Sequence, residues 1–358
     1  MKPIYITLQN GRIFKGWGFG KELSEPITCQ IVFTNSMVGY VENITNPNFF
    51  GQALVQSFPS VGNYGVNPSD SISEKTSLKA LIVSEHCTEP SNFRMEMTLS
   101  DFLTQQDVVG VYGVDTRALT KIICSEGSMN CLISNFDTSS KLDSVISTLS
   151  SYKISNAVKI QSTENIIEYA PENEKYRIGL FDFGTSEGII HDLLDLDCRV
   201  IRFPADTMAA TVQPYKLDGI VLSNGSGNPE DYPEVLDELE KLMSLKIPML
   251  GIDFGHLLLA KAHGAKVEPL KYGHHGGNIP VKYSGNGKVY VTTQAHVYGV
   301  ESIDQGKAET TFVNINDKTI AGLKYRNYPA ASVQFFPVRA KSPQDLTFLY
   351  EGLLNGKF

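Results

Sequence analysis

The second half of the chain carries the strongest constraint on the fold, because short apolar runs alternate there with segments of helical periodicity. Four such runs span residues 178–182, 198–203, 219–223 and 247–252. Continuous apolar runs of this length are typical of central strands in a parallel sheet, which are buried on both faces. The intervening segment 233–245 places its apolar side chains on one stripe, as an amphipathic helix does. This alternation predicts an α/β sheet with right-handed crossovers.

The first half of the chain is less regular. The runs 29–40 and 51–65 combine apolar residues with turn-forming Gly, Asn and Pro, as short strands and their turns do. Residues 114–127 have apolar positions at helical spacing and a terminal glycine, so we predict a helix there. A polar stretch follows. We therefore divide the chain into three parts, a domain over 1–150, a linker over 151–176 and a second domain over 177–358.

Composition narrows the class of protein. The 358 residues include 31 basic and 39 acidic ones, and the net charge of −8 argues against broad binding of nucleic acid or anionic membranes. No apolar run approaches the roughly 20 residues of a membrane span, and residues 1–14 lack the pattern of a secretory signal. The five cysteines are odd in number and have no CxxC spacing, which argues against a disulfide framework or a zinc site. We expect a cytoplasmic protein without metal or cofactor.

A pair of glycines frames an acidic residue directly after the run 247–252. The sequence Gly251-Ile252-Asp253-Phe254-Gly255 leads into an apolar segment with helical character. Two glycines at this spacing permit the sharp strand-to-helix turn of a nucleophile elbow. Such a turn exposes the middle side chain and leaves backbone N–H groups free to hold an oxyanion. The pattern alone has low specificity, since glycines often flank turns.

Further motifs occur in a fixed order around this elbow. They are SNFR (91–94), GVDTRALT (113–120), VLSNGSGNP (221–229), KYGHHGGNIPV (271–281) and SVQFFPV (332–338). With these motifs the chain resembles, over nearly its whole length, the small, glutamine-hydrolysing subunit of carbamoyl-phosphate synthetase. The resemblance implies an α/β protein in which an N-terminal α+β small-subunit domain precedes a class I glutamine amidotransferase-like domain with a mostly parallel sheet. It also implies a heteromeric complex with a large subunit, in pyrimidine and arginine biosynthesis.

The resemblance locates the catalytic triad of the family, and all three members are replaced. The nucleophilic cysteine corresponds to Asp253, the histidine base to Phe336 and the glutamate that orients it to Val338. A carboxylate is a poorer nucleophile than a thiolate toward an amide. Phe336 cannot carry a proton, and general acid–base help is worth about 10²–10⁴-fold. Two apolar side chains can pack together without unsatisfied polar atoms, so we expect this part of the site to have become core.

The glutamine pocket implied by the family is partly retained. Positions that remain compatible with their family roles are Ser36, Gly225, Gly227, Phe254 and Tyr298. Positions that have lost the family's residue are Leu257, Ala295 and Val297. The two glycines can also persist because their turn needs backbone freedom. Residues 182–189 match the family's DFGxKxNI strand-turn in part. Substituted site residues beside retained scaffold motifs indicate lost glutaminase chemistry on a kept fold.

Asp253 could instead have acquired a new role. Some α/β hydrolases use an elbow aspartate with a histidine base, but the sequence places none of the seven histidines as that base. His256, three residues further on, matches a family histidine that is not the base. A metal site would need third and fourth ligands at a recognisable spacing, and none is evident. A carboxylate at a helix N-terminus also gains from the helix dipole without any catalytic role.

Three hypotheses about function follow from these observations. The first is a small-subunit homologue that has lost glutaminase activity and supports or regulates a synthetase large subunit, which would use free ammonia. The second is a scaffold or ligand-binding protein detached from the synthetase. The third is a repurposed hydrolase with Asp253 as its nucleophile. Docking to a large subunit favours the first, and turnover that depends on Asp253 favours the third.

Overall fold

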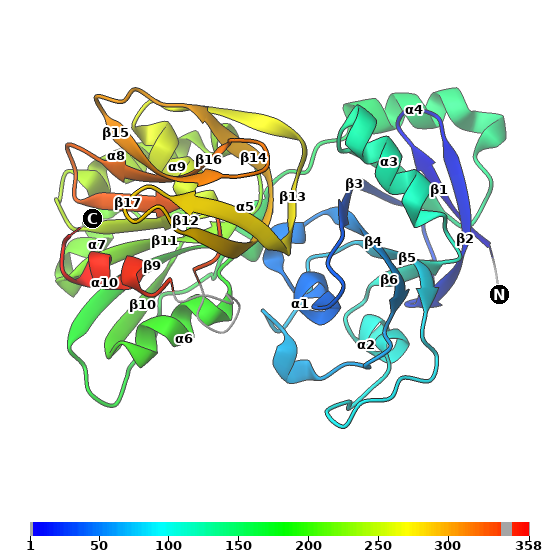
Figure 1. Ribbon diagram of the computed structural model, residues 1–358, viewed down its shortest axis with the longest axis horizontal. Coiled ribbons are helices and arrows are strands. Elements are labelled where there is room, and N and C mark those ends of the chain that lie inside the picture. The colour runs from blue at the N-terminus through cyan, green and yellow to red at the C-terminus, as the bar shows by residue number, and fades with distance from the viewer. Residues whose placement is uncertain (1–2, 338–345, 358) are drawn as a thin grey trace. The chain divides into compact units, whose positions relative to one another are not determined.

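The computed structural model describes residues 3–337 and 346–357, and the chain forms two compact units, each with its own sheet (Figure 1). Unit 1 consists of Met1–Ser155 together with Lys271–His275. Unit 2 consists of Asn156–Leu270 and Gly276–Phe358. Among the described residues, no helix is both long and apolar enough to cross a membrane.

Unit 1 is built on a closed barrel of seven strands in the order β1-β2-β6-β5-β4-β3-β7. The strands are β1 (Pro3–Leu8), β2 (Ile13–Gly20), β3 (Ile27–Thr34), β4 (Gln52–Val61), β5 (Ala80–His86), β6 (Val109–Tyr112) and β7 (Met129–Ser134). Strands β3 to β6 pair in parallel, and the remaining pairs are antiparallel. Alternate side chains such as Ile4, Ile6 and Ile31 fill the interior, as the two-residue period of a barrel strand requires.

Four α-helices lie among the described residues of unit 1, namely α1 (Tyr40–Ile44), α2 (Leu99–Gln105), α3 (Thr116–Glu126) and α4 (Leu142–Ser151). Helix α3 confirms the helix predicted over 114–127. The side chain of Asp115 caps its first turn by accepting a hydrogen bond from the backbone N–H of Ala118 at 2.9 Å. Gly127 ends it with a φ of 100°, which favours glycine. Leu119, Ile122 and Ile123 are buried, as their spacing predicts.

The segment Lys271–His275, part of a motif noted in the sequence, completes unit 1 from far along the chain. The backbone N–H of Ser128 donates to the carbonyl of Lys271 at 2.8 Å. The ring of Tyr272 lies 5.9 Å from that of Phe33, and His275 stacks on Phe49 at 5.6 Å. Burial, together with the neighbouring His274, lowers the pKa of His275 to about 3. His275 is therefore a neutral core residue of unit 1.

Unit 2 contains a ten-stranded sheet in the order β14-β13-β15-β16-β17-β12-β11-β9-β10-β8. Its central strands are parallel, namely β9 (Tyr176–Phe183), β10 (Cys198–Pro204), β11 (Gly219–Gly225), β12 (Met249–Ile252) and β17 (Ala330–Val333). The four apolar runs coincide with β9 to β12, so the mostly parallel sheet is confirmed. Antiparallel pairing adds β8 (Ile167–Tyr169), β13 (Lys266–Tyr283), β14 (Val289–Ser302), β15 (Ala308–Asn314) and β16 (Ile320–Tyr325).

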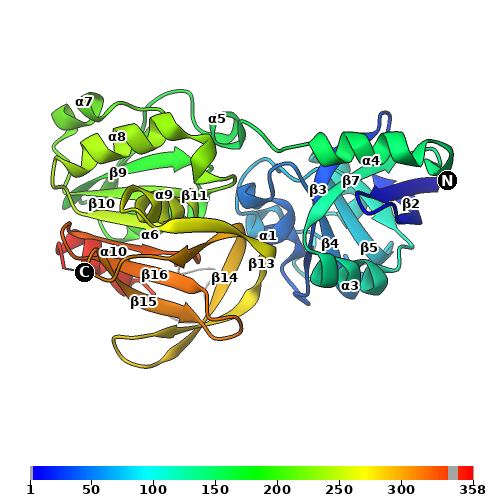
Figure 2. The same ribbon diagram turned by 90° about the horizontal axis from the view of Figure 1, so that it is seen from above.

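Helices cover both faces of this sheet (Figure 2). One face carries α5 (Ala157–Gln161), α7 (Ala209–Val212), α8 (Pro233–Met243) and α9 (Phe254–Ala262), which share an apolar core with the strands. Helix α6 (Glu187–Asp195) packs against β10, and α10 (Phe348–Leu354) packs against β11 and β12. A side chain at Gly219 would touch Leu353 of α10, while the next residue, Ile220, belongs to the core of the α9 face. Strand alternation therefore places α10 on the opposite face from α9.

The segment 151–176, expected to be a linker, contains ordered elements. Val158 of α5 is buried in the core of unit 2, and β8 pairs with β10 at the edge of the sheet. These elements are too short for an apolar periodicity to be recognised in the sequence.

Candidate functional site

The turn between β12 and α9 has the geometry of a nucleophile elbow. Asp253 adopts φ 54° and ψ −102°, a region that non-glycine residues rarely occupy. Its backbone N–H donates to the carbonyl of Val333 in β17 at 2.8 Å. Its own carbonyl accepts from the N–H of Leu257 at 3.1 Å, which starts α9. The sharp strand-to-helix turn expected from the glycine spacing is therefore confirmed.

The flanking glycines are required by close packing. A Cβ on Gly251 would lie 2.6 Å from the carbonyl oxygen of Gly255, and a Cβ on Gly255 would lie 2.3 Å from the carbonyl oxygen of Leu222 in β11. Cβ atoms do not approach backbone oxygens this closely, so α9 could not pack against β11 with alanine at Gly255. The two glycines thus bring the elbow residue against the end of β11.

The carboxylate of Asp253 is buried, with an exposure of 1 %. Its Oδ1 accepts a hydrogen bond from Nε2 of Gln334 at 3.1 Å, and its Oδ2 accepts one from the backbone N–H of Gly225 at 3.3 Å. The elbow side chain thus lies against one of the expected pocket positions, Gly225. Both oxygens have a donor, and the start of α9 adds a favourable dipole.

The replaced family positions that the structure describes in unit 2 are mainly apolar and buried. Phe336 is 4 % exposed, and its backbone N–H donates to the carbonyl of Thr293 in β14 at 3.0 Å. Leu257 and Ala295 are 2 % and 3 % exposed, and Val297 is half-buried. Val338 lies outside the described residues. The environment of Phe336 is that of a core side chain.

The retained pocket positions divide between the two units. Ser36 belongs to unit 1, where its Oγ accepts a hydrogen bond from Oγ1 of Thr34 at 3.2 Å. Gly227, in unit 2, has a φ of 124°, and Phe254 packs edge-on against the ring of Tyr232. The turn and the core of unit 2 therefore suffice to explain why these two residues persist.

Tyr298 is half-buried on β14. Burial raises the pKa of its hydroxyl, and the nearby carboxyl groups of Asp231 and Glu230 raise it further. Both effects favour the protonated form of the hydroxyl.

Sequence reasoning did not assign a role to Gln334, the side chain that holds Oδ1 of Asp253. Gln334 directly follows β17, Asp253 directly follows β12, and Gly225 ends β11. These strands are parallel neighbours, so their carboxyl ends meet at one edge of the sheet, where α/β proteins place functional groups. The order of the strands in the sheet is the information that would have shown that these residues lie together. That order was not available from the sequence.

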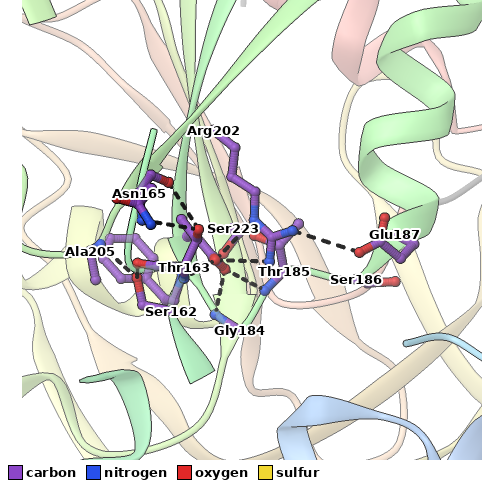
Figure 3. A network of polar contacts seen from close by, with 12 residues as sticks. Ser162, Thr163, Asn165, Gly184, Thr185, Ser186, Glu187, Arg202, Ala205 and Ser223 are labelled. Atoms are coloured by element: carbon purple, nitrogen blue, oxygen red, sulfur yellow. Dashed lines mark hydrogen bonds and ion pairs between the residues drawn. The ribbon is translucent and has the colours of Figure 1, made fainter. Parts of the chain in front are cut away.

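A second buried network fixes the turn between β9 and α6, which lies beside the end of β11. Asp182, at the end of β9, accepts hydrogen bonds from the backbone N–H groups of Thr163, Gly184 and Thr185 at 2.6, 3.1 and 2.8 Å. Arg202 of β10 reaches the same carboxylate at 2.8 Å and approaches Glu187 at 3.7 Å (Figure 3). These donors compensate a charge that is fully buried.

The network continues into β11 through its last residues. The side chain of Asn224 accepts from the backbone N–H of Ser186 at 2.9 Å and donates to the carbonyl of Gly184 at 2.8 Å. Oγ of Ser223 accepts from the backbone N–H of Phe183 at 2.9 Å. The residues just before Gly225 are therefore held in place, and so is the N–H group that Gly225 directs at Asp253.

His256, on the first turn of α9, is bonded away from the elbow side chain. Its Nδ1 lies 2.7 Å from Oγ of Ser332, which is also hydrogen-bonded to the hydroxyl of Tyr325 at 2.9 Å. Its Nε2 has no hydrogen-bond partner among the described residues. Complete burial lowers the pKa of His256 to about 3, so the ring is neutral at pH 7. Within the described ranges, no group of three or more His, Cys, Asp or Glu side chains could hold a metal ion.

Comparisons with known proteins agree with this two-part architecture. Residues 6–133 match the model of "Carbamoyl-phosphate synthase small chain, CPSase domain", and residues 179–355 match "Glutamine amidotransferase class-I". The "Carbamoyl phosphate synthase small chain" of Clostridium acetobutylicum is 40 % identical over 358 residues, which cover 99 % of this chain and 100 % of that protein. The protein of the same name in Bacillus anthracis is 38 % identical over 352 residues, 98 % of this chain and 94 % of that protein. The chain belongs to the carbamoyl-phosphate synthase small chain family.

Replacing Gly255 by alanine should destabilise unit 2. The new Cβ would meet the backbone of β11, and overpacking of this kind costs about 1–3 kcal/mol. Denaturant unfolding of Gly255→Ala measures the loss. Gly277→Ala is the matched control, because its Cβ would lie 3.6 Å from Thr293, an ordinary contact. Equal stability of the two variants would contradict the close packing at the elbow.

Stability should fall as the pH falls from about 6.5 toward 3, in part because of His256. In the unfolded chain this ring takes up a proton near pH 6.5, whereas the folded protein keeps it neutral down to about pH 3. The unfolded state therefore binds more protons in this pH range. As a result, His256 lowers the free energy of unfolding by up to about 1.4 kcal/mol for each unit by which the pH falls. Thermal melts between pH 7 and 4.5 should show a shallower dependence in His256→Asn, although that variant is less stable overall. His191→Asn, which replaces an exposed histidine, is measured in parallel as the control for the loss of a histidine.

Proposed function

We propose that this chain is a carbamoyl-phosphate synthase small subunit that has lost glutaminase activity and supports or regulates a large subunit, which uses free ammonia. The observation that carries the proposal is the state of the elbow. The turn is intact, but its side chain is a buried carboxylate held by the backbone of Gly225 and the amide of Gln334. The proposal keeps the family's synthesis of carbamoyl phosphate, a precursor in pyrimidine and arginine biosynthesis, but not its glutamine supply.

The chemistry of this arrangement opposes glutamine hydrolysis. Attack by Asp253 on an amide would form a mixed anhydride, which is higher in energy than the thioester made by a cysteine. The donors on its two oxygens also stabilise the resting carboxylate and lower its nucleophilicity. No imidazole is available at Phe336 to protonate the leaving ammonia.

A backbone N–H group at an expected pocket position is also engaged. An amidotransferase stabilises its tetrahedral intermediate with backbone N–H groups directed at the developing negative oxygen. The N–H group of Gly225, an expected pocket position, donates instead to Oδ2 of Asp253. The side chain of the elbow thus takes the interaction that a substrate oxygen would need. This arrangement supports the proposal of an inactive site independently of the missing base.

The hydrolase alternative finds no specific support in the surroundings of Asp253. The nearest candidate base in the sequence, His256, is bonded to Ser332, and its lowered pKa makes it a weak base. Activation of a water molecule would need a base directed at the ester formed on Asp253. We therefore give the alternative no separate mechanism.

The purified chain should release no ammonia from glutamine above a buffer blank. A small subunit of this family with an intact Cys-His-Glu triad, assayed in parallel, serves as the positive control. Coupled glutamate detection at saturating glutamine measures the activity. Glutamine hydrolysis that disappears in Asp253→Ala would disprove the proposed loss of function, because the activity would then depend on the elbow side chain.

Restoring the thiol alone should not restore activity. Asp253→Cys returns a nucleophile at a helix N-terminus, which lowers a thiol pKa, but Phe336 still offers no base. Members of one catalytic unit act non-additively, so a single restored member recovers little. The triple variant with Phe336→His and Val338→Glu should be weakly active at best. It should also lose about 1–3 kcal/mol for each polar group left unsatisfied. A family-like rate from Asp253→Cys alone would show that base and pocket are functionally intact.

The chain should bind the cognate large subunit at micromolar concentrations and permit carbamoyl-phosphate synthesis from ammonium but not from glutamine. Size-exclusion chromatography detects the complex, and product formation with each nitrogen source tests the proposed division of labour. The control is the large subunit alone with ammonium. Separate elution of the two proteins would refute the supporting role and would favour a scaffold that has left the synthetase.

A further inference from the structure

Phe93 is an aromatic side chain left almost entirely in water. It is 95 % exposed and lies in the SNFR motif, in the loop between β5 and α2 of unit 1. The other large apolar side chains described as exposed are less so, with Met37 and Val38 at 69 % each. A single exposed apolar residue is common on protein surfaces, so the conformation of its loop decides what the exposure means.

The loop around Phe93 is a defined turn. The backbone N–H of Met95 donates to the carbonyl of Asn92 at 3.1 Å, which closes a β-turn over residues 92–95. The side chain of Asn92 accepts from the backbone N–H of Arg94 at 2.8 Å and reinforces this turn. Phe93 therefore occupies the first central position of a turn whose backbone is fixed.

The neighbours of Phe93 attach the turn to the rest of unit 1. Arg94 forms an ion pair with Asp70 at 2.7 Å, and its carbonyl accepts from the side chain of Asn67 at 3.0 Å. The side chain of Met95 packs over Gly65, where an added Cβ would come within 2.3 Å of it. The turn is thus held on one side by charge and on the other by packing. The side chain of Phe93 itself stays exposed to solvent.

We propose that Phe93 is a docking anchor that inserts into an apolar socket on the synthetase large subunit. A rigid turn presents the ring without the entropy cost of ordering a loop, and aromatic anchors of this kind dominate binding at protein interfaces. The charge of Arg94 is already matched by Asp70, so the tip offers apolar surface rather than charge.

The choice of occupant rests on the proposed function. Phe93 lies within residues 6–133, which match the small-chain domain and not the amidotransferase domain. The SNFR motif carries none of the elbow chemistry, so its role is sought outside glutamine hydrolysis. We therefore assign the large subunit, the partner of the small chain as a whole, as the occupant. The socket that receives the ring need not carry charge.

The test compares two Phe→Ala variants in binding to the cognate large subunit, measured by titration calorimetry on full-length chains. Phe93→Ala should weaken binding about 30-fold or more, the usual effect of removing an interface hot spot. Its melting temperature should remain that of the wild type, because the ring is exposed. Phe136→Ala, at a 45 % exposed position elsewhere in unit 1, should leave the affinity unchanged. A photo-crosslinking amino acid at position 93 should form a covalent adduct with the large subunit.

Each other outcome overturns the assignment in a different way. Wild-type binding that Phe93→Ala leaves unaltered would reject the anchor while the proposed function stands. No binding by the wild type would reject both the anchor and the supporting role. Self-association of the wild-type chain that Phe93→Ala abolishes would identify a second copy as the occupant and would reject the large subunit in that place.

Discussion

The central interaction of unit 2 is the pair of hydrogen bonds that holds the carboxylate of Asp253 at the carboxyl edge of the parallel strands. Its donors come from the end of β11 and from the residue after β17, the strands on either side of β12. Gly255 allows α9 to approach β11 closely enough for these groups to meet. The elbow, the glycine turn and the end of β17 therefore depend on one another.

The Asp182 network supports that arrangement from the other side of β11. The Asp182 carboxylate accepts hydrogen bonds from backbone N–H groups and pairs with Arg202. The side chain of Asn224, the residue before Gly225, is hydrogen-bonded to the same turn. A buried charge is costly unless it is compensated. Asp182 has Arg202 and three backbone donors, and Asp253 has a donor on each oxygen. The polar groups around Asp253 and Asp182 thus hold the carboxyl ends of these strands beside buried apolar side chains such as Phe336.

The sequence predicted those parts of the structure that local patterns determine. The runs that became β9 to β12, the helix α3 and the elbow turn each carry their signal within a few residues. The barrel of unit 1, the antiparallel strands β13 to β16 and the contact between Gln334 and Asp253 depend on pairing between distant segments, which periodicity does not report. The candidate site came from the resemblance to the family. The burial of the Phe336 ring follows from the apolar nature of that side chain. The role of Gln334 could be read only from the strand order.

The placement of Lys271–His275 in unit 1 has a consequence for the order of folding during synthesis. His275 supplies a buried ring against Phe49, and Lys271 supplies the acceptor for the N–H group of Ser128. A ribosome that has completed residue 155 has therefore not yet made the whole of unit 1. Domains usually fold as units from the N-terminus during translation. Here residues 271–275 emerge only after much of the second unit has been synthesised. The nascent chain therefore passes through a stage in which Phe49 lacks the ring of His275 that packs on it in the complete unit.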